Sequence, residues 1–225
     1  MAKDFNIKEK VLEVSIELFY ENGYDNTSIQ NIIDTVQISK GALYHYFKSK
    51  EEILEEIASR YAGQTFNALS ELIENEQGNA LDKFNALISV SNEYKTKNIN
   101  VKKREVIGKI FTQYSDIKTR HKIEETLITL IQPIYIDIIT QGQKEGVFDI
   151  ISPKDTAHIF LRLMFELKKE LIVSLSEEKD TKKKGEILKE KLEFMEHFIE
   201  KILGVKHGSI QFAENTLERY KQNHK

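Results

Sequence analysis

Residues 27–50 read TSIQNIIDTVQISKGALYHYFKSK, and this stretch decides the fold that the sequence predicts. Thr27 and Gln30 match the capping-box pattern, so we expect a short helix to begin there. Its apolar residues recur at helical spacing: Ile29, Ile32, Ile33 and Val36. After a short break, Ser39 is expected to cap a second helix that ends near Tyr46. The stretch therefore predicts two short helices joined by a tight turn.

The second of these helices carries four consecutive rings, which cannot all face a core. On a helical wheel at about 100° per residue, one arc holds the residues expected to point inward, Leu43, Tyr46 and Phe47. The opposite arc holds Gly41, Ala42, Tyr44 and His45. That outward side is small and polar, which suits close approach to a surface rich in hydrogen-bond acceptors.

Positive charge gathers on this helix and its flanks. Residues 1–50 contain six lysines and seven acids, a net charge of −1, whereas residues 36–50 contain three lysines and no acid. Two consecutive helices, of which the second is basic and has small side chains on its outward side, are typical of a helix-turn-helix that enters a DNA major groove. Taken alone, the pattern leaves open a helical hairpin that only packs its aromatic residues.

Helical spacing continues through nearly the whole chain, with no alternating strand pattern and no internal repeat, so the fold class is all-α. Ser49 opens a long fourth helix, at about 49–74, with a second capping box. Further helices are expected at about 80–96, 102–115, 119–143, 153–175, 186–203 and 209–222, the last capped by Ser209. The charged segment 176–186 mixes acids with lysines and is expected to be a solvated loop.

Composition limits the class of protein. The net charge is −3, so any nucleic-acid surface must be local. The absence of cysteine excludes disulfides and thiolate metal sites. The N-terminus has no apolar segment of a signal peptide, and no apolar run is long enough to span a membrane. These features fit a protein of a reducing compartment such as the cytoplasm.

No pattern of catalytic residues is recognisable, so we predict a protein that is not an enzyme. The chain has no phosphate-binding loop and no nucleophile elbow, and its six histidines are scattered, so neither a metal site nor a cofactor is expected. The central helices carry aromatic and apolar residues that either fill the core or surround an apolar ligand cavity. The candidate pocket residues are Phe84, Phe111, Tyr114, Tyr135, Phe160 and Met164.

Residues 23–53, GYDNTSIQNIIDTVQISKGALYHYFKSKEEI, resemble the DNA-binding domain of the tetracycline-repressor (TetR) family of bacterial transcription regulators. The resemblance covers roughly residues 5–60. It includes the Gly-aromatic pair, the Thr/Ser helix start, the Ser-x-Gly start of the next helix, the Leu-Tyr-x-x-Phe core and the Ser-Lys opening of the fourth helix. One departure is Gln37, in a turn that usually carries glycine in this family.

The resemblance implies a helix-turn-helix domain at residues 1–48, with helix four leading out of it, and a larger helical bundle at 49–225 for ligand binding and dimerisation. The residues expected to face double-stranded operator DNA are Thr27, Ser39, Lys40, Gly41, Ala42, Tyr44, His45, Lys48 and Lys50. Tyr44 and Lys50 are expected mainly to hold phosphates. The expected function is that of a ligand-responsive homodimeric repressor, released from a palindromic operator by an unknown small molecule. The dimer is implied through helices at about 153–175 and 186–203. The resemblance also implies a bacterial cytoplasmic protein, associated with the nucleoid through DNA binding.

Two other classes of protein remain possible from the sequence. One is a helical interaction module that does not bind DNA, against which the acid-free stretch 36–50 argues. The other is a small all-α enzyme, against which the lack of a catalytic pattern argues. The effector, the operator, the choice between repressor and activator and the role of the helix at 209–222 are not encoded in any recognisable pattern.

Overall fold

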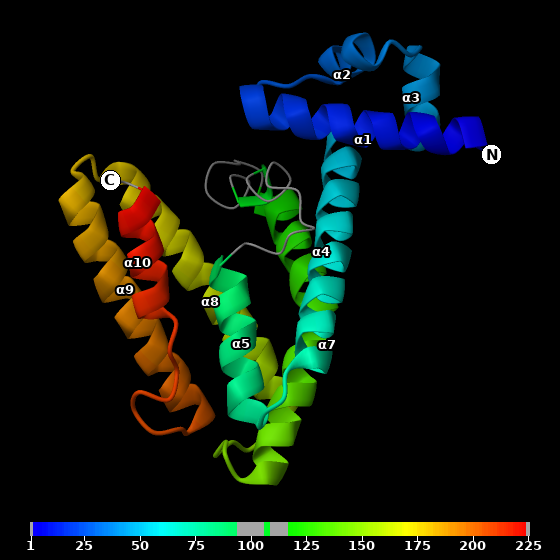
Figure 1. The fold of residues 1–225 in the computed structure, drawn as a ribbon. Coiled ribbons are helices and arrows are strands. Elements are labelled where there is room, and N and C mark those ends of the chain that lie inside the picture. Colours follow the sequence, from blue (N-terminus) through cyan, green and yellow to red (C-terminus); the bar gives the residue numbers. More distant parts are fainter. Residues whose placement is uncertain (1, 94–105, 109–116, 224–225) are drawn as a thin grey trace. The chain divides into compact units, whose positions relative to one another are not determined.

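The computed structural model describes residues 2–93, 106–108 and 117–223, and every regular element in these ranges is helical (Figure 1). The all-α prediction is confirmed. The helices are α1 (Ala2–Asn22), α2 (Ile29–Val36), α3 (Lys40–Tyr46), α4 (Lys50–Asn75), α5 (Ala80–Glu93), α7 (Ile117–Glu145), α8 (Pro153–Glu177), α9 (Thr181–Leu203) and α10 (Ala213–Asn223). Of the helix expected at 102–115, only residues 106–108 are described, and they are helical.

The first of two compact units comprises Met1–Gln64 and Asn98–Leu127. Within it, α2 and α3 lie on the same side of α1 (Figure 1). Its fully buried side chains come from all four N-terminal helices and include Phe19, Ile32, Leu43, Phe47, Ile53 and Ile57. Because α2 and α3 are too short to bury much surface alone, the first turns of α4 complete their core.

The second unit comprises Thr65–Lys97 and Ile128–Lys225. Its core is aromatic at the centre: the Phe84 ring lies 5.9 Å from the Tyr135 ring and 5.3 Å from the Phe160 ring, between centroids. Helix α9 packs against α8, and α10 lies along α9 (Figure 1). The first division between the units falls within α4, after Gln64, and another falls within α7, after Leu127, whereas the resemblance implies a single boundary after residue 48.

The structure corrects the start of α2. Thr27 is not the cap; Ser28 is, since its hydroxyl accepts from the Asn31 backbone N–H at 3.1 Å and the Asn31 side chain accepts from the Ser28 N–H at 2.8 Å. The Thr27 hydroxyl donates instead to the backbone carbonyls of Gly23 and Leu18. The capping box is therefore displaced by one residue.

Two further boundaries differ from the prediction. Helix α8 runs to Glu177 and α9 begins at Thr181, so the expected loop 176–186 shrinks to residues 178–180 because Asp180 caps α9 by accepting from Lys183 N–H at 2.9 Å. Helix α10 starts at Ala213, not at Ser209. A Glu196 carboxylate oxygen on α9 accepts from the N–H groups of Phe212 and Ala213, which satisfies the α10 N-terminus.

Candidate DNA interface

The turn between α2 and α3 is set by Gln37, which has φ 61° and ψ 49°, the left-handed conformation. Its backbone N–H donates to the carbonyl of Ile33 and closes α2. Two residues later Ser39 begins the next helix, accepting from the Ala42 N–H at 3.1 Å. The predicted cap of α3 is confirmed, and the residue that departs from the family pattern stands where the backbone favours glycine.

Helix α3 separates its rings as the sequence predicts. Leu43 and the following Phe47 are buried, whereas Tyr44 is 42% exposed and His45 is exposed. Tyr46 is half-buried and meets the His45 ring edge-on, at 4.9 Å between centroids. The outward side of the helix therefore presents one phenol and one imidazole.

Lysines flank these exposed rings. Lys40 and Lys48 are exposed, and the Lys40 ammonium lies 5.9 Å from the centroid of the Tyr44 ring. Ser39 is also exposed, and Ala42 is half-buried. We use the term α3 face for these exposed and half-buried residues together: Ser39, Lys40, Gly41, Ala42, Tyr44, His45 and Lys48.

Gly41 has no role in folding that the structure reveals. It lies exposed in the first turn of α3, and a Cβ added there would meet no atom within 4 Å. Its φ is not in the left-handed region, so the backbone does not demand glycine either. Glycine within a helix costs about 0.5–1 kcal/mol relative to alanine. Glycine at this exposed position therefore lowers the stability of the helix, and neither packing nor backbone conformation in the structure requires it.

Lys50 and Thr27, both expected to face DNA, are engaged inside the unit. The Lys50 ammonium donates to the backbone carbonyls of Tyr24 at 2.7 Å and Thr27 at 2.8 Å, and lies 4.1 Å from the Tyr24 ring centroid. Burial lowers the pKa of Lys50, against the opposing charges of Asp25 and Glu51. Thr27 is 1% exposed. Both residues hold the segment between α1 and α2 in place.

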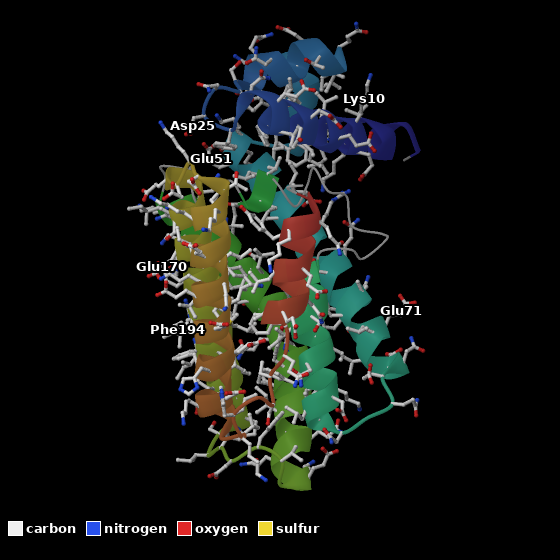
Figure 2. All side chains as sticks on the ribbon, turned by 60° about the vertical axis from the view of Figure 1, so that its left-hand side comes forward. Lys10, Asp25, Glu51, Glu71, Glu170 and Phe194 are labelled. Atoms are coloured by element: carbon white, nitrogen blue, oxygen red, sulfur yellow. The ribbon has the colours of Figure 1, made fainter. Side chains whose placement is uncertain are left out.

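A further lysine, which the sequence does not single out, acts at the end of α2. The Lys10 ammonium on α1 donates to the carbonyl oxygen of Val36 at 3.1 Å. A cation at a helix C-terminus interacts favourably with the helix dipole and satisfies an unpaired carbonyl. Lys10 projects from α1 in Figure 2. Lys10 and Val36 are 26 residues apart in the sequence, so no local sequence pattern predicts this contact.

Two family models match this sequence. The model described as bacterial regulatory proteins, tetR family, matches residues 11–57, and the model described as tetracyclin repressor-like, C-terminal domain, matches residues 95–184. Together they span more than half of the chain, and the first contains the whole helix-turn-helix. The chain belongs to the TetR family. It is a DNA-binding transcriptional regulator and not an enzyme.

Two TetR-family relatives share about a quarter of their residues with this chain over the matched length. The HTH-type transcriptional repressor KstR2 of Mycolicibacterium smegmatis is 23% identical over 159 residues, covering 69% of this chain and 74% of that protein. The fatty acid metabolism regulator protein of Bacillus subtilis is 26% identical over 137 residues, covering 61% of this chain and 68% of that protein. A solved structure of FadR from Bacillus subtilis in complex with stearoyl-CoA has a TM-score of 0.61 at 19% identity, covering 88% and 99% of the two chains.

In this TetR-family chain, the candidate pocket residues divide into two groups. Phe84, Tyr135, Phe160 and Met164 are buried, and the three rings contact one another. Phe111 and Tyr114 lie outside the described residues. The described members pack as a core, so a ligand among them would have to separate rings that touch here.

One cluster of potential metal ligands was not recognisable in the sequence. His197, Glu200 and His207 bring three ligand atoms within 4.8 Å of one another, the one such group among the residues that the structure describes. The spacing H197-x-x-E200-x6-H207 matches no familiar metal motif. His207 follows the end of α9, and only the turn after Gly204 returns it to Glu200.

In the described part of the chain, no helix is long and apolar enough to cross a membrane.

Proposed function

We propose that this TetR-family regulator is a homodimeric repressor that binds a partly palindromic operator through the α3 face and is released by a small molecule. The observation that carries the DNA-binding surface is Gly41, exposed and unexplained by folding. A helix without a side chain at its start can bring its backbone close to a groove wall. The neighbouring small Ala42 supports the same close approach.

The α3 face has the composition that duplex DNA requires. Lys40 and Lys48 supply charge for phosphates, which governs affinity and its dependence on salt. Tyr44 supplies a phenolic hydroxyl for a phosphate oxygen, and His45 supplies an imidazole at the level of base edges. Thr27 and Lys50 are left out of this surface, because their polar groups bind backbone carbonyls of the same unit.

The first experiment selects binding sites from genomic DNA and then compares two glycine variants by fluorescence anisotropy. Gly41→Ala adds a methyl group to the α3 face, and we expect it to weaken binding at least about tenfold, equivalent to about 1.4 kcal/mol. Gly63→Ala is the matched control, since Gly63 also lies in a helix with no atom within 4 Å of an added Cβ. Gly63→Ala should leave the affinity unchanged. Equal affinity of the two variants would remove the α3 face from the proposal.

Tyr44→Phe tests whether the phenol holds a phosphate or reads a base. Loss of a phosphate contact weakens binding to all sequences nearly equally, because phosphates carry no base information. We therefore expect the same fractional loss on the selected site and on random duplex. A loss confined to the selected site would assign Tyr44 to base recognition instead.

Dimerisation is proposed through α8 and α9, which carry exposed apolar side chains. Ile159 and Leu163 lie one turn apart on α8, and Phe194 on α9 is 52% exposed and stacked on Phe198, at 6.1 Å between ring centroids. Exposed apolar side chains gathered on adjacent helices are typical of protein–protein contact surfaces. A two-fold axis through such a pair would present two copies of α3 to successive half-sites on DNA.

Phe194 and Glu170 lie on the same side of the α8–α9 pair (Figure 2). Glu170 on α8 and Lys191 on α9 are paired at 3.9 Å, so charged side chains from both helices meet on this side. The Lys191 to Phe194 spacing is three residues, which places them on neighbouring parts of one helical surface. This arrangement supports an apolar contact surface with charged side chains beside it.

For the effector, a long-chain acyl-CoA is the first molecule to test, because one structural relative is described in complex with stearoyl-CoA. The aromatic centre of the second unit offers apolar residues to an acyl chain. The test adds stearoyl-CoA, or CoA alone as the control, to the protein–DNA complex. Release by stearoyl-CoA and not by CoA supports an acyl-chain effector, and no release at saturation by either excludes it.

A further inference from the structure

We propose that His197, Glu200 and His207 form a binding site for a divalent transition-metal ion, Zn²⁺ above all, that joins the end of α9 to the turn before α10. Both imidazoles turn Nδ1 toward the same Glu200 oxygen, Oε2, at 2.9 Å for His207 and 3.8 Å for His197. Two imidazole nitrogens and one carboxylate oxygen are ligands that Zn²⁺ accepts in proteins.

Two of the three distances between ligand atoms lie close to what a tetrahedral ion needs. Zinc bonds of about 2.0–2.1 Å place two neighbouring ligand atoms about 3.3 Å apart. The two nitrogen–oxygen separations lie on either side of this value, and all three ligand atoms lie within 4.8 Å of one another, so rotation of the exposed imidazoles would bring them onto one ion. A hydrogen bond with Glu200 explains the position of His207. It does not explain His197, whose nitrogen lies too far from Oε2 for such a bond.

Glu200 is held as a metal ligand should be. Its side chain is 3% exposed, and its other oxygen, Oε1, accepts from the backbone N–H of Gly208 at 2.6 Å and of Ile210 at 3.4 Å. Glu200 therefore has one oxygen fixed by the turn and one directed at the imidazoles.

The turn that returns His207 to α9 depends on glycines. Gly204 ends α9 with φ 65°, and a Cβ there would come within 2.7 Å of Asp149, so no other residue fits without a shift. Gly208 also has a left-handed φ, of 81°. His197 and His207 remain exposed, at 55% and 88%, so an ion could enter from solvent and water could complete its coordination.

In the ion-bound state, His207 would carry its remaining proton on Nε2 and present the Nδ1 lone pair to the metal. The hydrogen bond between His207 and Glu200 would then be replaced by two bonds to the ion. Because the chain contains no cysteine, no thiolate competes for Zn²⁺. The ion would fix the segment after α9, from which α10 continues.

The test uses the full-length chain without an affinity tag. We measure Zn²⁺ binding by calorimetry, the melting temperature with and without Zn²⁺, and the visible spectrum with Co²⁺, which reports coordination geometry. We expect one ion per chain, a melting temperature that rises with Zn²⁺ concentration by mass action, and a tetrahedral Co²⁺ spectrum.

Three variants distinguish a metal site from a hydrogen-bonded turn. His207→Asn keeps an N–H donor near the position of Nδ1 and so preserves the contact with Glu200, while His197→Asn removes only the more distant nitrogen. We expect each to weaken Zn²⁺ binding about tenfold or more, with the zinc-free melting temperature nearly unchanged. His121→Gln is the matched control, because His121 also lies 3.8 Å from a glutamate, Glu125, but this pair belongs to no group of three potential ligands among the described residues.

The outcomes separate clearly. Loss of binding in both asparagine variants, with binding retained in His121→Gln, supports the site. No saturable binding by the unmodified chain overturns it. Binding that survives His197→Asn and His207→Asn together also overturns it, since the ion would then lie elsewhere. If His207→Asn lowers the melting temperature without zinc, that variant is destabilised and His197→Asn alone decides. Unchanged Zn²⁺ binding in His197→Asn would then count against the proposal.

Discussion

The Lys50 ammonium lies 2.7 Å from the carbonyl oxygen of Tyr24 and 4.1 Å from the centroid of its ring. One side chain from the first turn of α4 thus contacts both the backbone and the ring of a residue 26 positions earlier. Because the same ammonium also reaches Thr27, it fixes the segment that leads into α2. Lys50, which the sequence suggests as a phosphate ligand, is hydrogen-bonded to two backbone carbonyls in the fold and stabilises the segment before α2.

Lys50→Ala should therefore destabilise the fold. A hydrogen bond to a charged group contributes about 1.5–3 kcal/mol, and partial exposure reduces this, so we expect a loss of about 1–2 kcal/mol in the free energy of unfolding. DNA affinity should fall for all sequences alike, because the segment before α2 loosens. Urea unfolding measures the first effect. Lys48→Ala, at an exposed lysine, should change stability by less than about 0.5 kcal/mol. Equal losses in the free energy of unfolding of Lys50→Ala and Lys48→Ala would contradict a role of Lys50 in holding the segment before α2.

Gln37→Gly should leave stability unchanged or increase it by up to about 1 kcal/mol, because a residue other than glycine is strained at φ 61°. The greater entropy of glycine in the unfolded chain reduces the gain. Gln64→Gly, within α4, should instead cost about 0.5–1 kcal/mol. Thermal unfolding compares the two changes. A clear drop in the melting temperature of Gln37→Gly would show that the glutamine side chain stabilises the turn.

Glu56 predicts a specific dependence of stability on pH. It lies 2.8 Å from Arg60 and 3.1 Å from Lys8, between α4 and α1. Burial raises the pKa of Glu56, but hydrogen bonds from Arg60 and Lys8 and their charges outweigh it, so the pKa lies below its ordinary value of 4.5. A carboxylate with a lowered pKa contributes stability above the unfolded-state value and loses it as the pH falls through the folded-state value.

Glu56→Gln should therefore destabilise the chain at pH 7, by no more than about 1 kcal/mol because the group is partly exposed. The difference from the unmodified chain should shrink as the pH falls below 4.5, the unfolded-state value. Denaturant unfolding at a series of pH values measures it. Glu71→Gln, at an exposed position on α4, is the control and should show no such trend. A difference that stays constant down to pH 3 would contradict the predicted linkage.

Phe194→Asp should disrupt the proposed dimer, because it removes a large apolar side chain from the contact surface and would bury a charge there. Sedimentation velocity measures the result as a shift from dimer to monomer. Ile151→Asp is the control: Ile151 is 99% exposed but precedes α8, outside the α8–α9 surface. It should leave the dimer intact. If the unmodified chain sediments as a monomer at micromolar concentrations, α8 and α9 do not form the proposed interface.

Local patterns predicted most of the secondary structure and the division of rings on α3. Ser39 and Ser49 cap helices as expected, because each accepts from a backbone N–H three residues later. Where a cap comes from elsewhere in the fold, the prediction was wrong. The start of α10 depends on Glu196, sixteen residues before Phe212, and no local pattern identifies such a partner.

The sequence by itself determined the all-α fold and the exposed side of α3, because these follow from helical spacing and short-range capping. The family followed from the resemblance of residues 23–53 to TetR-family DNA-binding domains. Tertiary structure decided which polar groups are free to meet a partner. Thr27 and Lys50 bind backbone carbonyls within the unit, so the DNA-facing set that we propose is the α3 face alone. Tertiary structure also brought His207 back to Glu200, since only the positive-φ turn after α9 closes that distance.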